Sequence, residues 1–420
     1  MTISKRDYGI VAVIYPLFIL VNYLQARDII PPGNPGEGIV IWPMRLFMLY
    51  VGIKGLLLNK SRCQLFSLYV VYSFLSVVLY LFNGFPIHLY INDLAFFILP
   101  MLFTYVGMDG GCTDDRFYKY TTWAIFASFV VGFYLYFFQP SWYQDAIVRN
   151  YNGRWYKEGI NASFDDIVDR LRFSSFYLTS YAIEYFGIFA FVISVCLIYK
   201  SNEWKIKWVN IMMALVIFAG VILSLQRAAI ATCILSLIIF ILYDWRHEGR
   251  LRWLFIFVAV AFVVFLVYFI QSDVGLKVVE RFSEFTVEDT FSDARTSQNV
   301  DLLNSWNNII LGDGLGTGGN EARKMGFPAV TDSQYVKILC EQGLVGFSIF
   351  LLFLLSSAVR VLKYFRYLAM EGAILACVMV AMIGSNSLMF DFIGPIWFAI
   401  GRIWNKEYLK NKIINKQYCI

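Results

Sequence analysis

Long runs of apolar residues fill most of the chain, and short polar segments separate them. A membrane-spanning helix needs about 20 mostly apolar residues. Backbone groups in lipid must find partners within their own segment, so runs of this length predict helices. Twelve runs fit this description: 8–25, 39–58, 65–83, 87–107, 119–138, 181–199, 207–225, 228–243, 252–270, 343–360, 369–386 and 391–405.

The positions of Lys and Arg predict how these twelve spans are oriented. Short cytoplasmic connections of membrane proteins are enriched in basic residues. With the N-terminus inside, as Lys5 and Arg6 suggest, every second connection is basic, whereas 84–86 and 387–390 on the outer side carry no Lys or Arg. Both termini are therefore expected in the cytoplasm. The basic residues on the inner side are Lys60, Arg62, Arg116, Lys119, Lys200, Lys205, Lys207, Arg246, Arg250, Arg252, Arg360, Lys363, Arg366, Lys406, Lys410, Lys412 and Lys416.

Composition supports an all-α polytopic membrane protein. Only 15% of the 420 residues are charged and 59% are hydrophobic, and the mean hydropathy is +0.61. A soluble domain carries about 25% charged residues. The shortage excludes an ordinary soluble enzyme, a disordered protein and a nucleic-acid-binding domain, so no nucleic-acid partner is expected. Residues 1–420 are predicted to form one transmembrane domain.

Two connections on the outer side, 139–180 and 271–342, are too long to be simple turns. Long loops in compact proteins are usually functional. Both are basic, aromatic and glycine-bearing, which favours contact with an anion at the outer membrane face. The alternative is a pair of solvated loops, or contact with anionic lipid headgroups.

The second long loop contains a predicted amphipathic helix followed by a glycine-rich turn. Apolar residues from Val300 to Ile310 recur at three- and four-residue spacing, with Arg295 at the N-terminal end of the helix and Gly312 as its stop. Backbone N–H groups of the Gly312–Gly319 segment could converge on an anion. A flexible turn is the alternative.

Asp332 precedes the tenth predicted span. Thr331 and Gln334 have the spacing of a capping box, so Asp332 can be read as a residue that starts a helix. The functional alternative is a carboxylate at the membrane boundary that takes a proton from a hydroxyl group.

Three arginines at the outer face are further candidates for binding an anion. Arg227 lies between two apolar runs with almost no loop, where a charge at membrane depth is costly and usually functional. Snorkelling to the headgroups is the alternative. Arg170 and Arg172 precede Ser174 and Ser175, and could bind a phosphate by forked hydrogen bonds or anchor the interface.

The order of these features resembles the O-antigen polymerase (Wzy) and O-antigen ligase (WaaL) superfamily. The resemblance covers roughly 170–350. It rests on Arg172 with Ser174-Ser175, Ser224-Leu-Gln-Arg227, Arg295 before the amphipathic helix, the glycine-rich turn, and Asp332-Ser-Gln-Tyr335 running into Glu341-Gln-Gly-Leu-Val-Gly346.

The resemblance implies a GT-C-like membrane glycosyltransferase that needs no metal and no cofactor. Such proteins act at the periplasmic face of the bacterial inner membrane on undecaprenyl-diphosphate-linked oligosaccharides, in lipopolysaccharide or other polysaccharide biosynthesis. A chain-length regulator and a flippase are the expected partners, with the lipid bilayer. By position, Arg227, Arg295 and Asp332 would be catalytic, and the substrate-binding residues would be Arg170, Arg172, Gly314, Gly316 and Tyr335.

Asp332 occupies the place where ligases carry a histidine base, so the resemblance favours a repeat-unit polymerase with inverting glycosyl transfer. A carboxylate at a helix N-terminus is a weak base, however. The alternatives are a ligase that transfers glycan to the lipid A core, and a flippase or secondary transporter, which twelve spans would also suit.

Overall fold

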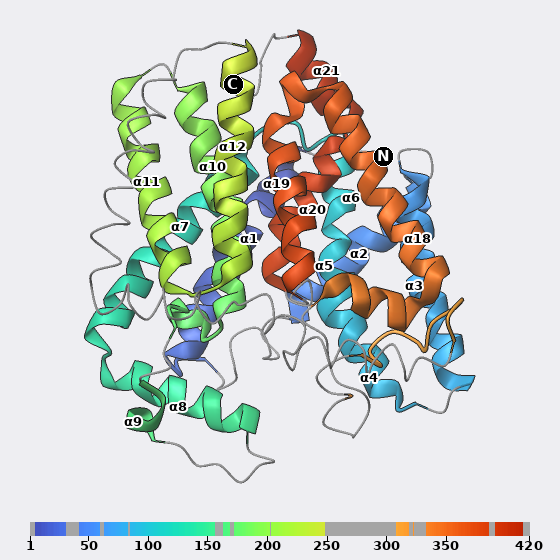
Figure 1. Cartoon of the computed structure of the whole chain (residues 1–420), viewed down its shortest axis with the longest axis horizontal. Coiled ribbons are helices and arrows are strands. Elements are labelled where there is room, and N and C mark those ends of the chain that lie inside the picture. The colour runs from blue at the N-terminus through green and yellow to red at the C-terminus, as the bar shows by residue number, and fades with distance from the viewer. Residues whose placement is uncertain are drawn as a thin grey trace, which may run out of the picture.

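The computed structural model describes residues 5–30, 42–58, 63–82, 85–155, 163–168, 172–201, 203–247, 308–318, 322, 333–385 and 391–414, and all regular structure within these ranges is helical (Figure 1). The α-helices are α1 (Lys5–Ala26), α2 (Trp42–Leu58), α3 (Gln64–Phe82), α4 (Ile87–Asp93), α5 (Leu99–Met101), α6 (Phe103–Met108), α7 (Arg116–Phe138), α8 (Ser141–Trp155), α9 (Phe164–Val168), α10 (Ser180–Lys200), α11 (Trp204–Leu223), α12 (Arg227–His247), α18 (Gln334–Lys363), α19 (Phe365–Gly384), α20 (Gly394–Ile403) and α21 (Lys406–Ile414). A π-helix, η2 (Leu94–Ile98), and two 3-10 helices, η4 (Ser175–Tyr177) and η5 (Asp391–Ile393), complete the set.

The chain is a polytopic membrane protein. Among the described residues, seven helices are long and apolar enough to cross a membrane: Gly9–Ala26, Ile87–Met108, Arg116–Phe138, Ser180–Lys200, Trp204–Leu223, Gln334–Lys363 and Phe365–Gly384. Two shorter apolar helices cover Gln64–Leu79 and Arg227–Tyr243.

The total of twelve spans remains a prediction for two reasons. The run 252–270 lies outside the described residues. The last predicted span consists of η5, with 3 residues, and α20, with 10 residues, which is shorter than the about 20 residues that a full crossing requires.

Helix α10 is the centre of the bundle and is buried along nearly its whole length. It packs against α7, α11, α12 and α19, and a second tight pair forms where α6 packs on α20. Gly107 and Gly401 allow this close approach, because a Cβ atom on either would collide with the backbone of the other helix. Phe117 and Phe398, with ring centroids 4.0 Å apart, fill the adjoining core.

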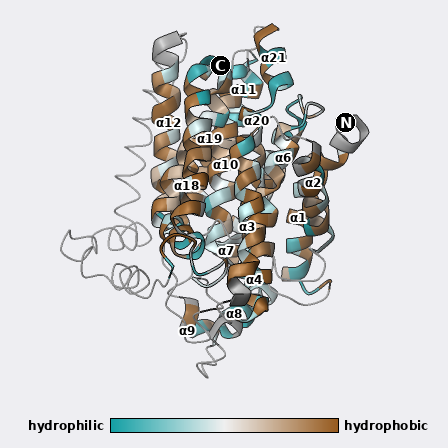
Figure 2. Ribbon diagram, turned by 90° about the vertical axis from the view of Figure 1, so that its right-hand side faces the viewer, coloured by the Kyte–Doolittle hydropathy of each residue, from teal (hydrophilic) through white to brown (hydrophobic). Residues whose placement is uncertain are grey.

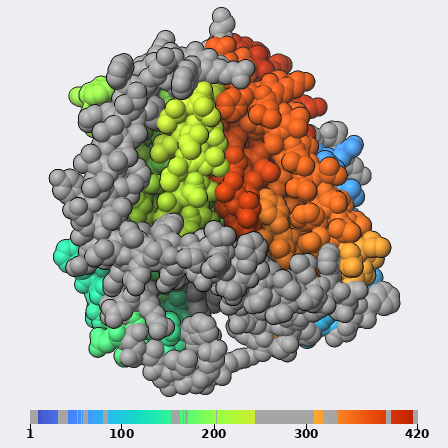
Figure 3. Space-filling view, viewed as in Figure 1, coloured from blue at the N-terminus to red at the C-terminus, as the bar shows by residue number. Residues whose placement is uncertain are grey.

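Peripheral helices expose apolar side chains where lipid would surround them. On the face shown in Figure 3, α12 (yellow-green) and α18 (orange) flank α19. Ile238 on α12 and Val359 on α18 are among the large apolar residues exposed on these helices. Figure 2 shows the same distribution, with hydrophobic residues along the helices and more hydrophilic residues towards their ends.

The two ends of the bundle carry different elements. Helices α4, α8 and α9 lie at one end and α21 lies at the other (Figure 1). In the predicted orientation, the α8 end faces the periplasm. The predicted outer loop 139–180 contains α8, α9 and η4, so it is partly helical.

Helix α18 differs from the predicted tenth span of 343–360 because it begins earlier, at Gln334. It is broken at Gly343, whose φ of 63° and ψ of −173° are not helical. The predicted span therefore begins at this break, and a shorter helical segment precedes it. Ser333 is the N-cap residue and makes no side-chain capping bond. The predicted capping box was wrong, since Gln334 is the first helical residue and not the third.

Candidate functional site

The predicted anion-binding residues Arg172 and Arg227 lie on chain segments that the fold joins. The N–H of Phe173 donates a hydrogen bond of 3.1 Å to the carbonyl oxygen of Leu223. Leu223 ends α11 and Arg227 begins α12, which confirms the predicted tight turn. Both arginines are partly buried. The fold therefore gathers two guanidinium-bearing segments, 172–175 and 223–227, in one corner of the bundle.

Strained backbone is concentrated at this corner. Ser175, Leu178 and Leu225 have φ values of 52°, 56° and 56°, which are uncommon for residues with a side chain. Such strain persists only where the surroundings enforce it, and it gathers at functional sites. Here Asn150 of α8 contributes by donating its side-chain amide to the carbonyl oxygen of Leu178 at 2.8 Å.

A buried carboxyl group, which was not predicted from the sequence, lies close to this corner. The amide of Gln226 donates to the hydroxyl of Ser180 at 2.6 Å. Glu184 lies one helical turn further along α10, is fully buried, and accepts a 3.4 Å hydrogen bond from Ser385. Its Oε1 atom has no hydrogen-bond partner among the described residues. The missed signal was a single acidic residue within the apolar run 181–199, which is expensive in a membrane and usually functional.

Backbone hydrogen bonds join the glycine-rich turn to α18. Gly312, Gly314 and Gly316 have φ values of 82°, 108° and 95°. The N–H of Gly312 donates to the carbonyl oxygen of Asn308 at 2.8 Å. The predicted amphipathic helix before Asn308 lies outside the described residues, so its stop at Gly312 stays a prediction. The N–H of Gly314 donates to the carbonyl oxygen of Glu341 at 2.9 Å. A Cβ atom on Gly316 would collide with the backbone of Leu89 on α4.

Three charged side chains lie buried beneath this turn. Lys337 Nζ is 2.5 Å from Asp93 Oδ2 and 3.4 Å from Glu341 Oε1. The same Glu341 oxygen accepts the N–H of Gly318 at 3.0 Å. The sequence contains one signal for this cluster, since Lys337 and Glu341 are four residues apart and thus share one helix face. This signal was not used in predicting the site, and the sequence does not indicate that Asp93 joins the two.

The remaining predicted site residues do not all fall within the described structure. Tyr335 is partly buried, and its hydroxyl donates to the carbonyl oxygen of Met379 at 3.0 Å. Arg170, Arg295 and Asp332 lie outside the described residues. Their predicted roles stay predictions, as does the predicted contact of Gly314 and Gly316 with substrate.

A buried ion pair joins α2 to η5. Arg45 Nη2 is 2.8 Å from Asp391 Oδ2, and both side chains are almost completely buried. The hydroxyl of Tyr15 donates to the backbone carbonyl oxygen of Asp391 at 2.8 Å. These contacts tie the segment that precedes α20 to α1 and α2.

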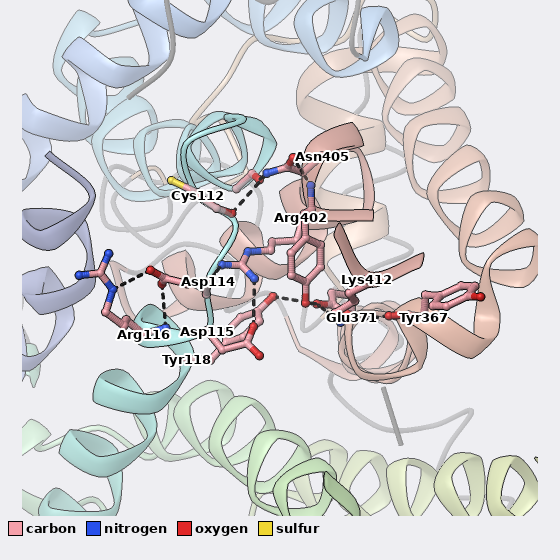
Figure 4. Close-up of polar contacts among 12 residues, drawn as sticks. Cys112, Asp114, Asp115, Arg116, Tyr118, Tyr367, Glu371, Arg402, Asn405 and Lys412 are labelled. Carbon is pink, nitrogen blue, oxygen red and sulfur yellow. Dashed lines mark hydrogen bonds and ion pairs between the residues drawn. The ribbon is translucent and has the colours of Figure 1, made fainter. Parts of the chain in front are cut away.

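A second polar cluster lies at the end of the bundle that carries α21 (Figure 4). Arg402 is fully buried, contacts Asp115 Oδ1 at 3.2 Å, and donates to the carbonyl oxygen of Asp114. Lys200 Nζ lies 3.3 Å from the other oxygen of Asp115. Reduced hydration opposes ionisation of Asp115, but Lys200 and Arg402 outweigh it and hold the pKa of this carboxyl below its usual range.

The same cluster contains contacts that join α20 and α21 to the rest of the bundle. Asn405 donates its side-chain amide to the carbonyl oxygens of Gly107 and Asp109 at 3.0 and 2.6 Å. Glu371 accepts the hydroxyl of Tyr408 at 2.7 Å. Lys412 donates to the carbonyl oxygen of Tyr367 at 3.0 Å. This end is therefore closed by a hydrogen-bonded network in the described part of the chain.

A known family model matches a stretch of the chain that contains both Arg227 and the glycine-rich turn. Residues 211–351 match the Wzy_C family model, which is described as O-antigen ligase. The matched range includes Arg227, the glycine-rich turn, Lys337 and Glu341. A search of curated proteins found no match for the chain.

Proposed function

We propose that the protein is a membrane glycosyltransferase that joins undecaprenyl-diphosphate-linked oligosaccharide repeat units into an O-antigen or capsular polysaccharide. The reaction would take place at the periplasmic face of the bacterial inner membrane. The main support is the match of residues 211–351 to the O-antigen ligase model, in a chain that carries Arg172 and Arg227 in one strained corner.

The proposed chemistry is an inverting transfer. A hydroxyl of the acceptor sugar attacks the anomeric carbon of the donor, the bond from that carbon to the diphosphate breaks, and a glycosidic bond forms on the opposite face. Negative charge gathers on the leaving diphosphate. Fixed guanidinium groups at a partly dry site stabilise such charge, which is the role we assign to Arg227 and Arg295. Arg172 and Arg170 would bind the same anion or the glycan.

Asp332 is the proposed acceptor of the proton that the sugar hydroxyl loses. It directly precedes Ser333, the N-cap of α18. Tyr335, Gly314 and Gly316 would line the path of the substrate. The hydroxyl of Tyr335 and the N–H of Gly314 already serve protein contacts. The proposed contribution of Tyr335 is therefore its ring, and that of Gly314 and Gly316 is the backbone conformation of the turn.

A ligase that transfers finished glycan to the lipid A core is the second candidate. The description of the matched family favours it. Asp332 favours the polymerase, because ligases of the family that the chain resembles carry a histidine at this place. Gene deletion separates the two: loss of a polymerase leaves single repeat units attached to the core, whereas loss of a ligase leaves no attached glycan.

The decisive experiment uses purified protein in detergent with a defined undecaprenyl-diphosphate oligosaccharide. A polymerase converts this single substrate into a ladder of lengthened products. A ligase produces no ladder and requires a lipid A core acceptor. If the protein forms neither a ladder nor a glycan attached to the lipid A core, the proposal is contradicted.

A further inference from the structure

The charged cluster beneath the glycine turn joins two helices that are distant in sequence. Lys337 on α18 contacts Asp93, the last residue of α4, and Glu341, one turn further along α18. The exposure of the three side chains is 0%, 5% and 1% respectively. The cluster therefore has one positive and two acidic groups with almost no access to water.

A buried cluster of charged groups contributes little to the stability of a fold. Removing charges from water costs several kcal/mol per ion, and apolar replacements of similar volume often leave a protein equally stable. Ionisable groups within membrane segments usually serve function instead. The three ionisable groups are therefore expected to hold a functional element in place.

They hold the glycine turn against two helices. Glu341 accepts the N–H of Gly318 through its side chain and the N–H of Gly314 through its backbone. The break at Gly343 lets the N–H groups of Leu344 and Val345 donate to the carbonyl oxygens of Ile309 and Ile310. The turn and the start of α18 thus form one hydrogen-bonded unit.

Lys337 fixes this unit to α4. Asp93 lies immediately before the π-helix η2, an irregularity that is frequent at functional sites. Gly316 touches the backbone of Leu89, one turn before Asp93. The ion pair and the glycine contact therefore lock the turn against one short stretch of α4.

We propose that Lys337, with Asp93 and Glu341, is a positioning cluster for glycosyl transfer. It keeps the glycine turn and the first turns of α18 in register with α4, and none of the three residues touches the reacting atoms. This inference rests on the proposed function, because it assigns these elements to the substrate path. Misplacing a substrate-binding element by about 1 Å can lower a rate about 100-fold.

The test compares full-length Lys337→Met, Glu341→Gln and the double variant Lys337→Met/Asp93→Asn with wild type. Lys363→Met is the matched control, since Lys363 lies on the same helix but is exposed at its far end. Each purified protein is measured for thermal stability, for kcat and KM with the lipid-linked oligosaccharide, and for amide hydrogen exchange in 309–318 and, as a reference, 350–362.

Lys337→Met should lower kcat about 100-fold, leave KM nearly unchanged, and speed exchange in 309–318 but not in 350–362. Glu341→Gln keeps an acceptor for Gly318 and should have the same effects, but weaker. The double variant removes the unpaired Asp93 charge, so it should regain thermal stability without regaining kcat. Lys363→Met should match wild type in all measurements.

Three results would overturn the inference. One is wild-type kcat in Lys337→Met. Another is a double variant in which kcat recovers together with stability, because that indicates a purely structural ion pair. The third is a loss of kcat with unchanged exchange in 309–318. If Lys337→Met does not fold, the double variant and Glu341→Gln decide. A wild-type protein without product contradicts the proposed function instead, and the exchange data still report whether the cluster holds the turn.

Discussion

The hydrogen bond from Phe173 N–H to the carbonyl oxygen of Leu223, 3.1 Å long, joins the segment after Arg172 to the turn before Arg227. Nothing in the spacing of these residues along the chain requires them to meet. Their meeting gives the bundle a corner with two guanidinium groups and three non-glycine residues at positive φ. This corner is where we expect the diphosphate to bind.

Substituting either arginine at this corner should abolish most activity. Arg227→Ala and Arg172→Ala each remove a charge that would stabilise the leaving diphosphate, so turnover should fall about 100- to 1,000-fold. Arg227→Lys keeps the charge but loses the forked hydrogen-bond geometry, so it should retain only part of the wild-type turnover. Product ladders from equal amounts of folded protein provide the measurement.

Arg116→Ala is the control for these variants. Arg116 is half-exposed at the opposite end and pairs locally with Asp114 at 2.7 Å. Its loss should leave turnover unchanged. Full-length polymer from Arg227→Ala would contradict the assigned role.

Glu184→Gln should be tolerated better than Glu184→Leu. The amide keeps the shape of the side chain and can still accept a hydrogen bond from Ser385, while it removes the cost of burying a carboxyl group for which the described residues supply no ion-pair partner. Leucine leaves the Ser385 hydroxyl without this acceptor, which costs about 1–3 kcal/mol. Thermal unfolding in detergent compares the two, and a less stable glutamine variant would refute this reading of the site.

Gly343→Ala should destabilise the protein by about 1–3 kcal/mol or more, because it combines positive φ with a Cβ atom that collides with the carbonyl group of Ile310. Gly9→Ala is the matched control, since nothing lies within 4 Å of the added atom. Alanine favours a helix interior over glycine, so this control should be neutral or slightly stabilising. Equal unfolding temperatures for both variants would show that the break in α18 is not enforced.

Substituting one partner of the Arg45–Asp391 pair should lower the unfolding free energy more than substituting both partners. Arg45→Met or Asp391→Asn alone leaves a buried charge without its partner, at a cost of about 3–5 kcal/mol. The double variant should recover much of the lost stability. A double-mutant cycle on unfolding free energy measures this, and strictly additive losses would argue against direct coupling.

Asp115 should make stability sensitive to acid. Its pKa is lowered in the folded protein, so its contribution is complete above the unfolded value of about 3.9 and is lost as the pH falls below it. The melting temperatures of wild type and Asp115→Asn should therefore differ by a constant amount from pH 8 to 5 and converge below about pH 4. If the difference in melting temperature between the two proteins instead increases as the pH falls, the lowered pKa of Asp115 is contradicted.

The sequence alone predicted most of the described helices of the bundle and several of their ends, while the predicted span 252–270 lies outside the described residues. Runs of apolar residues suffice because a segment in lipid must satisfy its own backbone, and the ends of two such runs correctly located the tight turn before Arg227. The sequence also named Arg227 as a candidate, because charge is rare at membrane depth, and Arg172, because it precedes two serines that could help to bind a phosphate.

Only the tertiary structure decided which polar groups share a site. Lys337 and Asp93 are separated by 244 residues, and periodicity carries no information about which helix faces pack together. The same holds for the Arg45–Asp391 pair and for Glu184 beside Ser385. Local backbone physics is encoded in neighbouring residues, whereas these contacts depend on the packing of the whole bundle.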